Sequence, residues 1–113
     1  MWITVFRNRL RTDAAADYGD VASRMKALAQ RMPGYIGFKT FSADDGERVS
    51  LVEFDSLEAL LAWKNHPEHR AAQERGRQAY YSEYSVQSAE IARDYRFSLD
   101  PQQPASSAIR SGD

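Results

Sequence analysis

Alternation of apolar and polar side chains predicts four strands along the chain. Residues 2–10 alternate around β-branched and aromatic types, residues 35–42 and 48–54 are rich in such types, and residues 84–97 mix polar and apolar positions. Asp44-Asp45-Gly46 separates the second run from the third. An Asp-Gly pair supplies the backbone that a tight hairpin turn needs, so we expect a hairpin there.

Apolar residues at three- and four-residue spacing predict helices between these strands. A helix from about Asp13 to Met32 would carry one apolar stripe, formed by Tyr18, Val21, Ala22, Met25, Leu28, Ala29 and Met32. Pro33-Gly34 would end it. A second helix would follow Asp55 or Ser56, with an interruption at Asn65-His66-Pro67. Pro67 suits the first position of a further helix that runs to about Arg77 or Tyr81.

The order of these elements predicts the fold class. It is β-α-β-β-α-β, the α+β ferredoxin-like arrangement, in which one antiparallel sheet carries its helices on a single face. We expect one such domain over residues 1–97. Residues 98–113, with two prolines and four serines, are expected to form an extended or flexible tail.

Composition narrows the classes of protein that fit. Leu, Ile, Val and Phe supply fewer than a fifth of the 113 residues, and a small chain with a thin core often gains stability by self-association. The absence of cysteine excludes disulfides, thiol catalysis and iron–sulfur clusters. A net charge of −1 argues against nucleic-acid binding, and no apolar run approaches the ~20 residues of a membrane span. We expect a cytoplasmic homodimer.

The helix after Pro67 carries the most informative pattern. Three- and four-residue spacing places small and polar residues on its inward face, namely His69, Ala72, Gln73, Gly76, Ala79 and Tyr80. Such residues leave room for a cavity with polar groups, and Trp63 and Phe54 could supply its flat apolar walls. The alternative is a helix that packs closely on the sheet, with its polar groups bonded to the backbone.

His66 and His69 are the candidate acid–base groups. A lone histidine suits a general base because its pKa lies near neutrality. The alternative is a surface or capping role, which fits His66 in particular because it precedes Pro67. No third ligand accompanies the pair, so we expect no metal site.

The first predicted strand carries polar residues on both faces. Asn8 shares a face with Trp2, Thr4 and Phe6, where it would bond either a ligand oxygen or a neighbouring backbone group. Arg7 and Arg9 lie on the opposite face. They are expected to pair across strands with Glu53, or to be buried in a subunit interface.

Two segments resemble the antibiotic biosynthesis monooxygenase family. One is Pro33-Gly34-Tyr35-Ile36-Gly37-Phe38-Lys39, and the more specific one is Trp63-Lys64-Asn65-His66-Pro67-Glu68-His69-Arg70-Ala71-Ala72-Gln73, followed by Gly76-Arg77 and Tyr80-Tyr81. The resemblance covers about residues 2–97. It implies a dimeric α/β barrel, in which two subunits face their open sheet surfaces together.

The resemblance also implies an activity. Members of the family oxidise polyphenols or quinols with O2 and no bound cofactor, and the deprotonated substrate itself supplies the electrons. On this chain, His66 or His69 would accept the proton, and Asn8 and Gln73 would orient the substrate or the reduced oxygen. Phe54 and Trp63 would form walls and Tyr80 would hydrogen-bond the substrate, with no cofactor, metal, nucleic acid or membrane involved.

Two alternatives stay open at this level. A haem-degrading branch of the superfamily uses an Asn, a Trp and an axial His; Asn8 matches the first, but Phe54 and Gln73 stand at the other two positions, and Gln is a poor iron ligand. Other relatives bind small molecules or serve in stress responses without catalysis. Fold alone does not choose among these functions.

Overall fold

The computed structural model describes residues 1–99 and contains one four-stranded sheet and three helices. The elements in chain order are β1 (Trp2–Leu10), α1 (Tyr18–Arg31), β2 (Tyr35–Ser42), β3 (Arg48–Phe54), α2 (Leu57–Lys64), α3 (Pro67–Ala79) and β4 (Tyr81–Glu90). The strands lie in the order β2-β3-β1-β4, and every neighbouring pair is antiparallel. The predicted α+β ferredoxin-like class is confirmed, with the second helical region divided at Asn65-His66.

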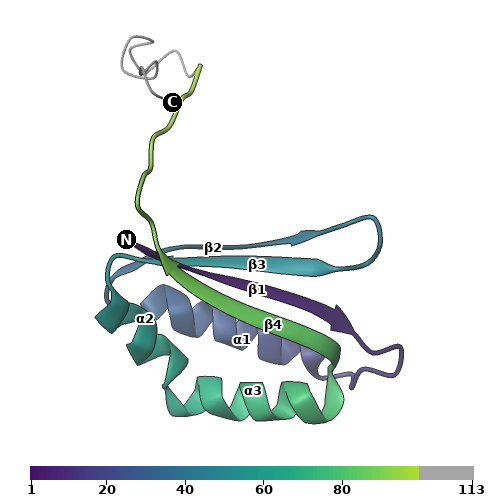
Figure 1. The fold of residues 1–113 in the computed structure, drawn as a ribbon. Helices are drawn as coiled ribbons and strands as arrows, with labels where there is room; N and C mark the ends of the chain where they lie inside the picture. Colours follow the sequence, from purple (N-terminus) through teal and green to yellow (C-terminus); the bar gives the residue numbers. More distant parts are fainter. Residues whose placement is uncertain (100–113) are drawn as a thin grey trace.

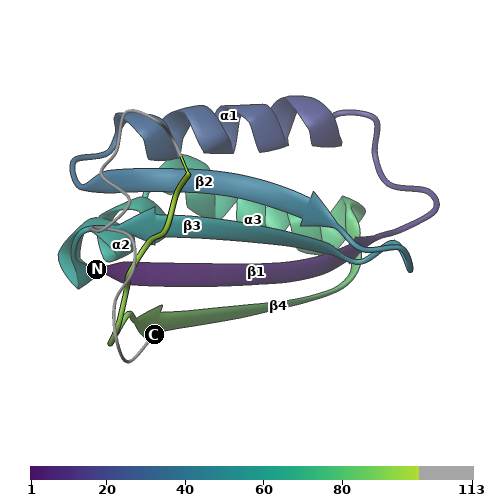
Figure 2. The ribbon, with the colours of Figure 1, turned by 90° about the horizontal axis from the view of Figure 1, so that it is seen from above.

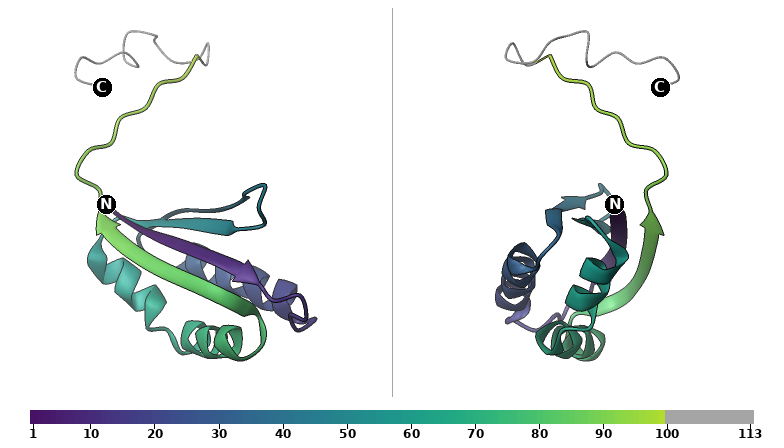
Figure 3. Two further views of the ribbon diagram at one scale, coloured as in Figure 1. Left: turned by 45° about the vertical axis from the view of Figure 1, so that its right-hand side comes forward. Right: turned by 90° about the vertical axis from the view of Figure 1, so that its left-hand side faces the viewer.

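All three helices lie on one face of the sheet (Figures 1 and 2). The sheet curves over them, so that α1 lies under the β2 side and α3 under the β4 side (Figure 3). Within residues 1–99, the other face of the sheet carries no helix (Figure 1). Side chains on the helix side of the sheet therefore line the interior of the protein. Side chains on the other side form a surface on which a partner could pack.

The core lies at one end of the space between sheet and helices. Leu28 and Ala29 of α1, Val52 and Phe54 of β3, and Leu60 of α2 are almost completely buried together. At the opposite end of α1, Tyr18 and Val21 lie outside this cluster of buried residues. One apolar stripe therefore serves two purposes: its C-terminal half fills the core, and its N-terminal half borders a hollow.

The first helix begins later than the pattern predicts. Residues 11–17 form a loop tied to the end of α3, because the Arg11 and Ala15 amides donate to the carbonyls of Tyr80 (2.8 Å) and Ala79 (3.0 Å). These tertiary hydrogen bonds hold residues 11–15 against the end of α3 in an irregular conformation, so the helix begins only after them.

The last strand also differs from the predicted range of 84–97. It begins at Tyr81, which pairs with Leu10, and it ends at Glu90, which pairs with Trp2. Its partner β1 begins at Trp2, so residues after Ile91 have no strand on which to continue the ladder. Residues 91–99 instead leave the sheet on the side opposite the helices (Figure 1).

The arginines of β1 find other partners than the one predicted. Arg7 forms a two-bond ion pair with Glu47 at 2.9 Å, and Arg9 contacts Asp45 at 2.8 Å and Glu83 at 3.0 Å. Glu53 does share their face of the sheet, but it lies opposite Ile3 at the other end of β1. The predicted pairing with Glu53 is therefore wrong. Alternation along a strand predicts which face of the sheet a side chain lies on, but the register between strands determines which residue lies next to it.

Two further predictions from the sequence concern the C-terminal tail and a membrane span. The predicted tail falls almost entirely at positions 100–113, outside the described residues. Within residues 1–99, no helix is both long and apolar enough to cross a bilayer.

Candidate functional site

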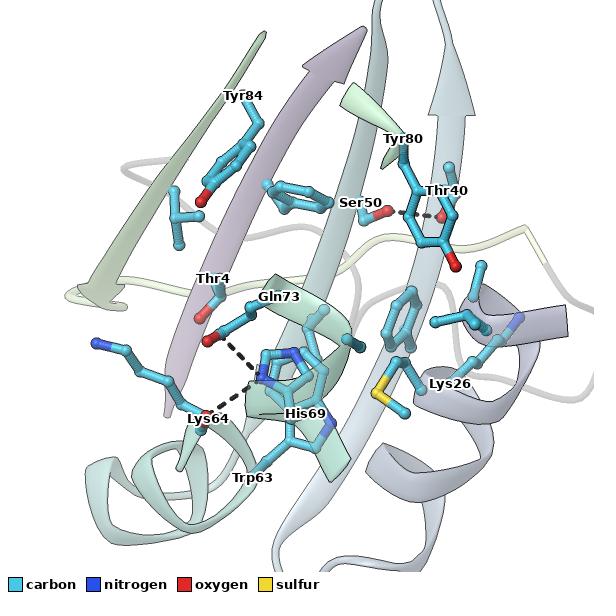
Figure 4. Close-up of a pocket in the computed structure, with 18 of the residues that line it drawn as sticks. Thr4, Lys26, Thr40, Ser50, Trp63, Lys64, His69, Gln73, Tyr80 and Tyr84 are labelled. Atoms are coloured by element: carbon cyan, nitrogen blue, oxygen red, sulfur yellow. Dashed lines mark hydrogen bonds between the residues drawn. The ribbon is translucent and has the colours of Figure 1, made fainter. Parts of the chain in front are cut away.

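A cavity of about 630 Å³ lies between the inner face of the sheet and the helices (Figure 4). This volume falls in the range of small-molecule sites, roughly 300–1,000 Å³. Tyr84 and Val86 of β4 border it and stay 39% and 53% exposed, although they point to the helix side. The cavity therefore reaches solvent beneath the β4 edge.

Three side chains from α2 and α3 gather at one end of the cavity. The His69 ring lies 4.1 Å from the Trp63 ring, between centroids, and His69 Nδ1 lies 3.1 Å from the Gln73 amide nitrogen. His69 Nδ1 also lies 3.2 Å from the Lys64 carbonyl oxygen (Figure 4). Pro67 starts α3 in the orientation that brings His69 and Gln73, one turn apart, to the same face.

The hydrogen bonds of His69 select a tautomer. A backbone carbonyl can only accept, so the contact with Lys64 requires a proton on Nδ1. The Gln73 side chain can also accept this proton, through its Oε1, when its amide group is rotated by half a turn. Nε2 then carries the lone pair of the neutral ring.

Burial keeps this ring neutral. Desolvation lowers the pKa of His69 below its ordinary value of 6.5 and outweighs the hydrogen bond to the Lys64 carbonyl, which acts in the opposite direction. A neutral imidazole with a free lone pair at a cavity wall can accept a proton from a bound acid.

Aromatic rings enclose the other end of the cavity. Tyr18, Tyr81 and Tyr84 lie edge to face with one another or with Phe6, at centroid distances of 5.4–6.0 Å. Polar pairs interrupt the apolar floor of the sheet. Thr4 hydrogen-bonds Ser88 at 2.9 Å, and Thr40 hydrogen-bonds Ser50 at 2.8 Å (Figure 4). Flat apolar walls with a few polar groups suit a planar aromatic ligand.

Two buried donors at the cavity, the indole N–H of Trp63 and the hydroxyl of Tyr80, make no hydrogen bond of ordinary geometry within residues 1–99. The side chains of Asp17 and Arg75 nevertheless lie close enough to the Tyr80 hydroxyl to shift its pKa in opposite directions. Burial raises the pKa of Tyr80 above its ordinary value, so the hydroxyl keeps its proton. An unsatisfied buried donor costs about 1–3 kcal/mol, and an acceptor brought within reach by a small rotation would recover part of it.

The structure brings four of the seven predicted site residues to the cavity, namely Trp63, His69, Gln73 and Tyr80. Phe54 lies behind Trp63, at 5.7 Å between ring centroids, and is fully buried in the core. His66 caps α3, where its Nδ1 accepts from the Glu68 amide at 3.1 Å.

Asn8 lies outside this cavity as well. Its side chain is 3% exposed, and its Oδ1 has no hydrogen-bond partner among residues 1–99. It borders a smaller hollow of about 200 Å³ with Tyr84 and charged residues at the loop end of the sheet.

Several residues of the cavity were missed by the sequence reasoning. Arg48 and Ser50 line it from β3, and Lys26 lines it from α1. The signal for the first two was available: once Phe54 points to the helices, alternate positions along the strand point the same way. Lys26 adjoins the apolar stripe of its helix and carries no such signal.

Comparison with known proteins supports a family assignment. The family model described as antibiotic biosynthesis monooxygenase matches residues 1–75. A protein of Bacillus subtilis (strain 168), YqjZ, is 32% identical over 96 residues, which cover 85% of this chain and 84% of the relative.

Solved structures agree in fold. SnoaB, a cofactor-independent oxygenase from Streptomyces nogalater, superposes in a mutant form with a TM-score of 0.69 and 16% identity, over 82% of this chain and 94% of that one. Rv0793 from Mycobacterium tuberculosis gives a TM-score of 0.72 and 16% identity, over 82% and 96% of the two chains. At this identity the structures show a shared fold. With a family model that matches two thirds of its length and a relative above 30% identity, the chain belongs to the antibiotic biosynthesis monooxygenase family.

Proposed function

We propose that this protein is a cofactor-independent monooxygenase that oxidises a small aromatic, quinol or polyphenol-like compound with O2. The observation that carries the proposal is the neutral, half-buried His69 at the wall of a cavity with aromatic sides. A phenolic substrate becomes a good electron donor to O2 once it loses its proton. The protein then needs only to desolvate the substrate, position it and hold that proton.

His69 is the proton acceptor in this proposal. Its Nδ1–H is held by the Lys64 carbonyl, which leaves Nε2 to take the phenolic proton. His66 is less suited, because its Nδ1 already accepts from the backbone of α3 and its side chain does not line the cavity.

The other cavity residues position the substrate. The Trp63 and His69 rings are in contact with their planes inclined by 40°, they give the substrate ring an aromatic wall, and Phe54 supports Trp63 from behind. The Tyr80 hydroxyl donates to a substrate oxygen, and Gln73 orients the substrate or the reduced oxygen next to His69. Asn8 stays a prediction from the sequence that no contact with the cavity supports.

The overall reaction balances without an external reductant. A phenol with a free para C–H reacts with one O2 to give a quinone and one water. One oxygen atom enters the ring, the C–H is replaced by C=O, and the phenolic hydrogen and the ring hydrogen leave as water. The substrate loses four electrons, and O2 accepts them.

The proposal includes a cytoplasmic homodimer. On the sheet face that no helix of residues 1–99 covers, four apolar side chains are half-buried, namely Ile3, Val5, Val49 and Leu51, and Phe41 is 48% exposed. An apolar patch of this kind suits a partner of the same chain, as in the dimeric α/β barrel that the family resemblance implies.

Oxygen uptake by metal-stripped protein with a panel of phenols and quinols tests the proposed activity. We expect uptake above the autoxidation rate with at least one compound, and loss of that uptake in His69→Gln. The Arg24→Gln variant, changed on the exposed side of α1, is the control and is expected to match the wild type. Uptake that disappears on metal removal and returns with metal would contradict the proposal.

A further inference from the structure

The charged residues around the cavity are all of one sign. Lys26, Arg48, Lys64 and Arg77 line it, and none of the lining residues within positions 1–99 carries a carboxylate. The chain as a whole has 16 acidic and 15 basic residues. The segregation is therefore a property of this site and not of the composition, and it gives the cavity a positive potential.

Arg48 differs from the other three cations. It is the first residue of β3 and points to the helix side, in step with Ser50, Val52 and Phe54. It is half-buried, while Lys26, Lys64 and Arg77 are exposed. Arg77 is also neutralised by Glu74. Arg48 is therefore the cation most removed from water and least shielded from a ligand.

Arg48 also differs from other arginines of the chain in its contacts. Arg7, Arg9, Arg11, Arg75 and Arg77 each form an ion pair with a carboxylate. Arg48 has no ion pair and no side-chain hydrogen bond within residues 1–99, and its guanidinium lies 5.2 Å from the Tyr18 ring centroid. This cation–π contact holds the guanidinium beside Tyr18 and leaves its N–H donors available for a carboxylate or phenolate.

The spacing along β3 sets the shape of a ligand. Val52, beside Leu60 and Trp63 in the core cluster, is four residues from Arg48 on the same face, which corresponds to about 13 Å along a strand. A ligand that reaches from Arg48 to the His69–Trp63 pair must therefore be elongated.

We propose that the cavity selects an elongated aromatic anion, with its acidic group held by Arg48 and its phenolic ring placed at Trp63 and His69. The orientation rests on the proposed function, because it assigns the reacting end to His69. The charge preference rests only on the unpaired guanidinium and the carboxylate-free lining.

Calorimetric titration under nitrogen with a matched pair of probes tests this selection. The acid is 6-hydroxy-2-naphthoate, which carries its two oxygen groups at opposite ends, and the neutral comparator is its methyl ester. At pH 7.5 we expect the wild type to bind the acid at least about tenfold more tightly than the ester, a typical effect for a charge-assisted contact. Equal affinities, or binding of neither probe, would overturn the proposal.

Substitutions of Arg48 test whether this residue causes the preference for the acid over the ester. Arg48→Gln is expected to weaken the acid about tenfold and the ester less than about twofold, and Arg48→Lys is expected to keep part of the preference because it keeps the charge. Arg24→Gln removes the same net charge from the exposed side of α1 and is expected to leave both affinities unchanged. An equal loss for acid and ester in both Arg48 variants, or a preference that persists in Arg48→Gln, would contradict the assignment.

The two proposals fail separately. Acid-selective binding that depends on Arg48, without oxygen uptake on any phenol, would overturn the monooxygenase and leave the anion site standing. Oxygen uptake that requires His69, with no discrimination between acid and ester, would overturn the anion site alone.

Discussion

His69 is the residue on which the proposed chemistry depends. General-base catalysis contributes about 10²–10⁴-fold to a rate. We therefore expect His69→Gln to reduce kcat for the confirmed substrate by at least about 100-fold, while circular dichroism stays that of the wild type. The comparison is His66→Asn, whose side chain can still cap α3. A large loss in His66→Asn with little loss in His69→Gln would show that the base has been assigned to the wrong histidine.

The lowered pKa of His69 also affects stability. The unfolded chain binds a proton near the ordinary histidine pKa of about 6.5, and the folded protein binds it only at lower pH. The unfolded state holds more protons between these two values, so the free energy of unfolding falls as the pH is lowered through that window.

Urea denaturation at pH 7.5 and 5.5 measures this dependence. We expect the wild type to lose stability between the two values and His69→Gln to lose less. The carboxylates whose pKa values are lowered, such as Asp45 and Glu47, titrate below this window and do not obscure it. An identical pH dependence in the two proteins would show that His69 titrates as an ordinary surface histidine.

The sequence correctly predicted which side chains at and near α3 share one helical face. His69, Gln73 and Tyr80 reach the cavity because helical spacing fixes their direction, and Trp63 reaches it from the preceding helix. Asn8 and Phe54 share the correct sheet face but not the cavity, since their place along the strand decides what they contact. The unpaired state of Arg48 depends on which carboxylates lie nearby in the fold, and a single sequence does not contain that information.

Among the elements, α3 shapes the cavity through a glycine. Gly76 faces Tyr81, and a Cβ at this position would lie 2.7 Å from Tyr81 Cε2. Tyr81 lines the cavity and contacts Phe6, so the close approach of helix and strand positions the aromatic end of the site. A larger residue would push α3 away from the start of β4.

Two glycine-to-alanine changes separate packing from helix propensity. Gly76→Ala is expected to destabilise the protein by about 1–3 kcal/mol, the usual cost of overpacking. Gly19→Ala, in α1 with nothing within 4 Å of the new Cβ, is expected to stabilise it by about 0.5–1 kcal/mol. Chemical denaturation of both variants measures the difference. A Gly76→Ala protein as stable as the wild type would contradict the packing argument.

Element boundaries could be predicted only where local signals set them. β1, β2 and β3 match the alternation, and the hairpin forms at Gly46, where φ is +91°. The start of α1 and the range of β4 did not follow from local pattern, because the end of α3 and the length of β1 determine them. The periodicity of the sequence carries no information about such tertiary contacts.

For the whole molecule, the uncovered sheet face predicts a dimer. Sedimentation velocity at micromolar concentration is expected to give about twice the chain mass of 12.8 kDa. Leu51→Arg, at the centre of this face opposite Val5, should shift the protein toward monomer. Leu57→Arg changes an equally apolar residue that is 40% exposed on α2 and should leave the dimer intact. A monomeric wild type would contradict the dimeric barrel.

The fate of molecular oxygen tests the central proposal most directly. The phenol that gives the fastest oxygen uptake would be turned over by metal-stripped protein under ¹⁸O2, and the product analysed by mass spectrometry. The account predicts one ¹⁸O atom in each quinone product and the other in water, with the labelled product lost in His69→Gln. A product whose new oxygen comes from water, or an unlabelled product accompanied by hydrogen peroxide, would contradict it.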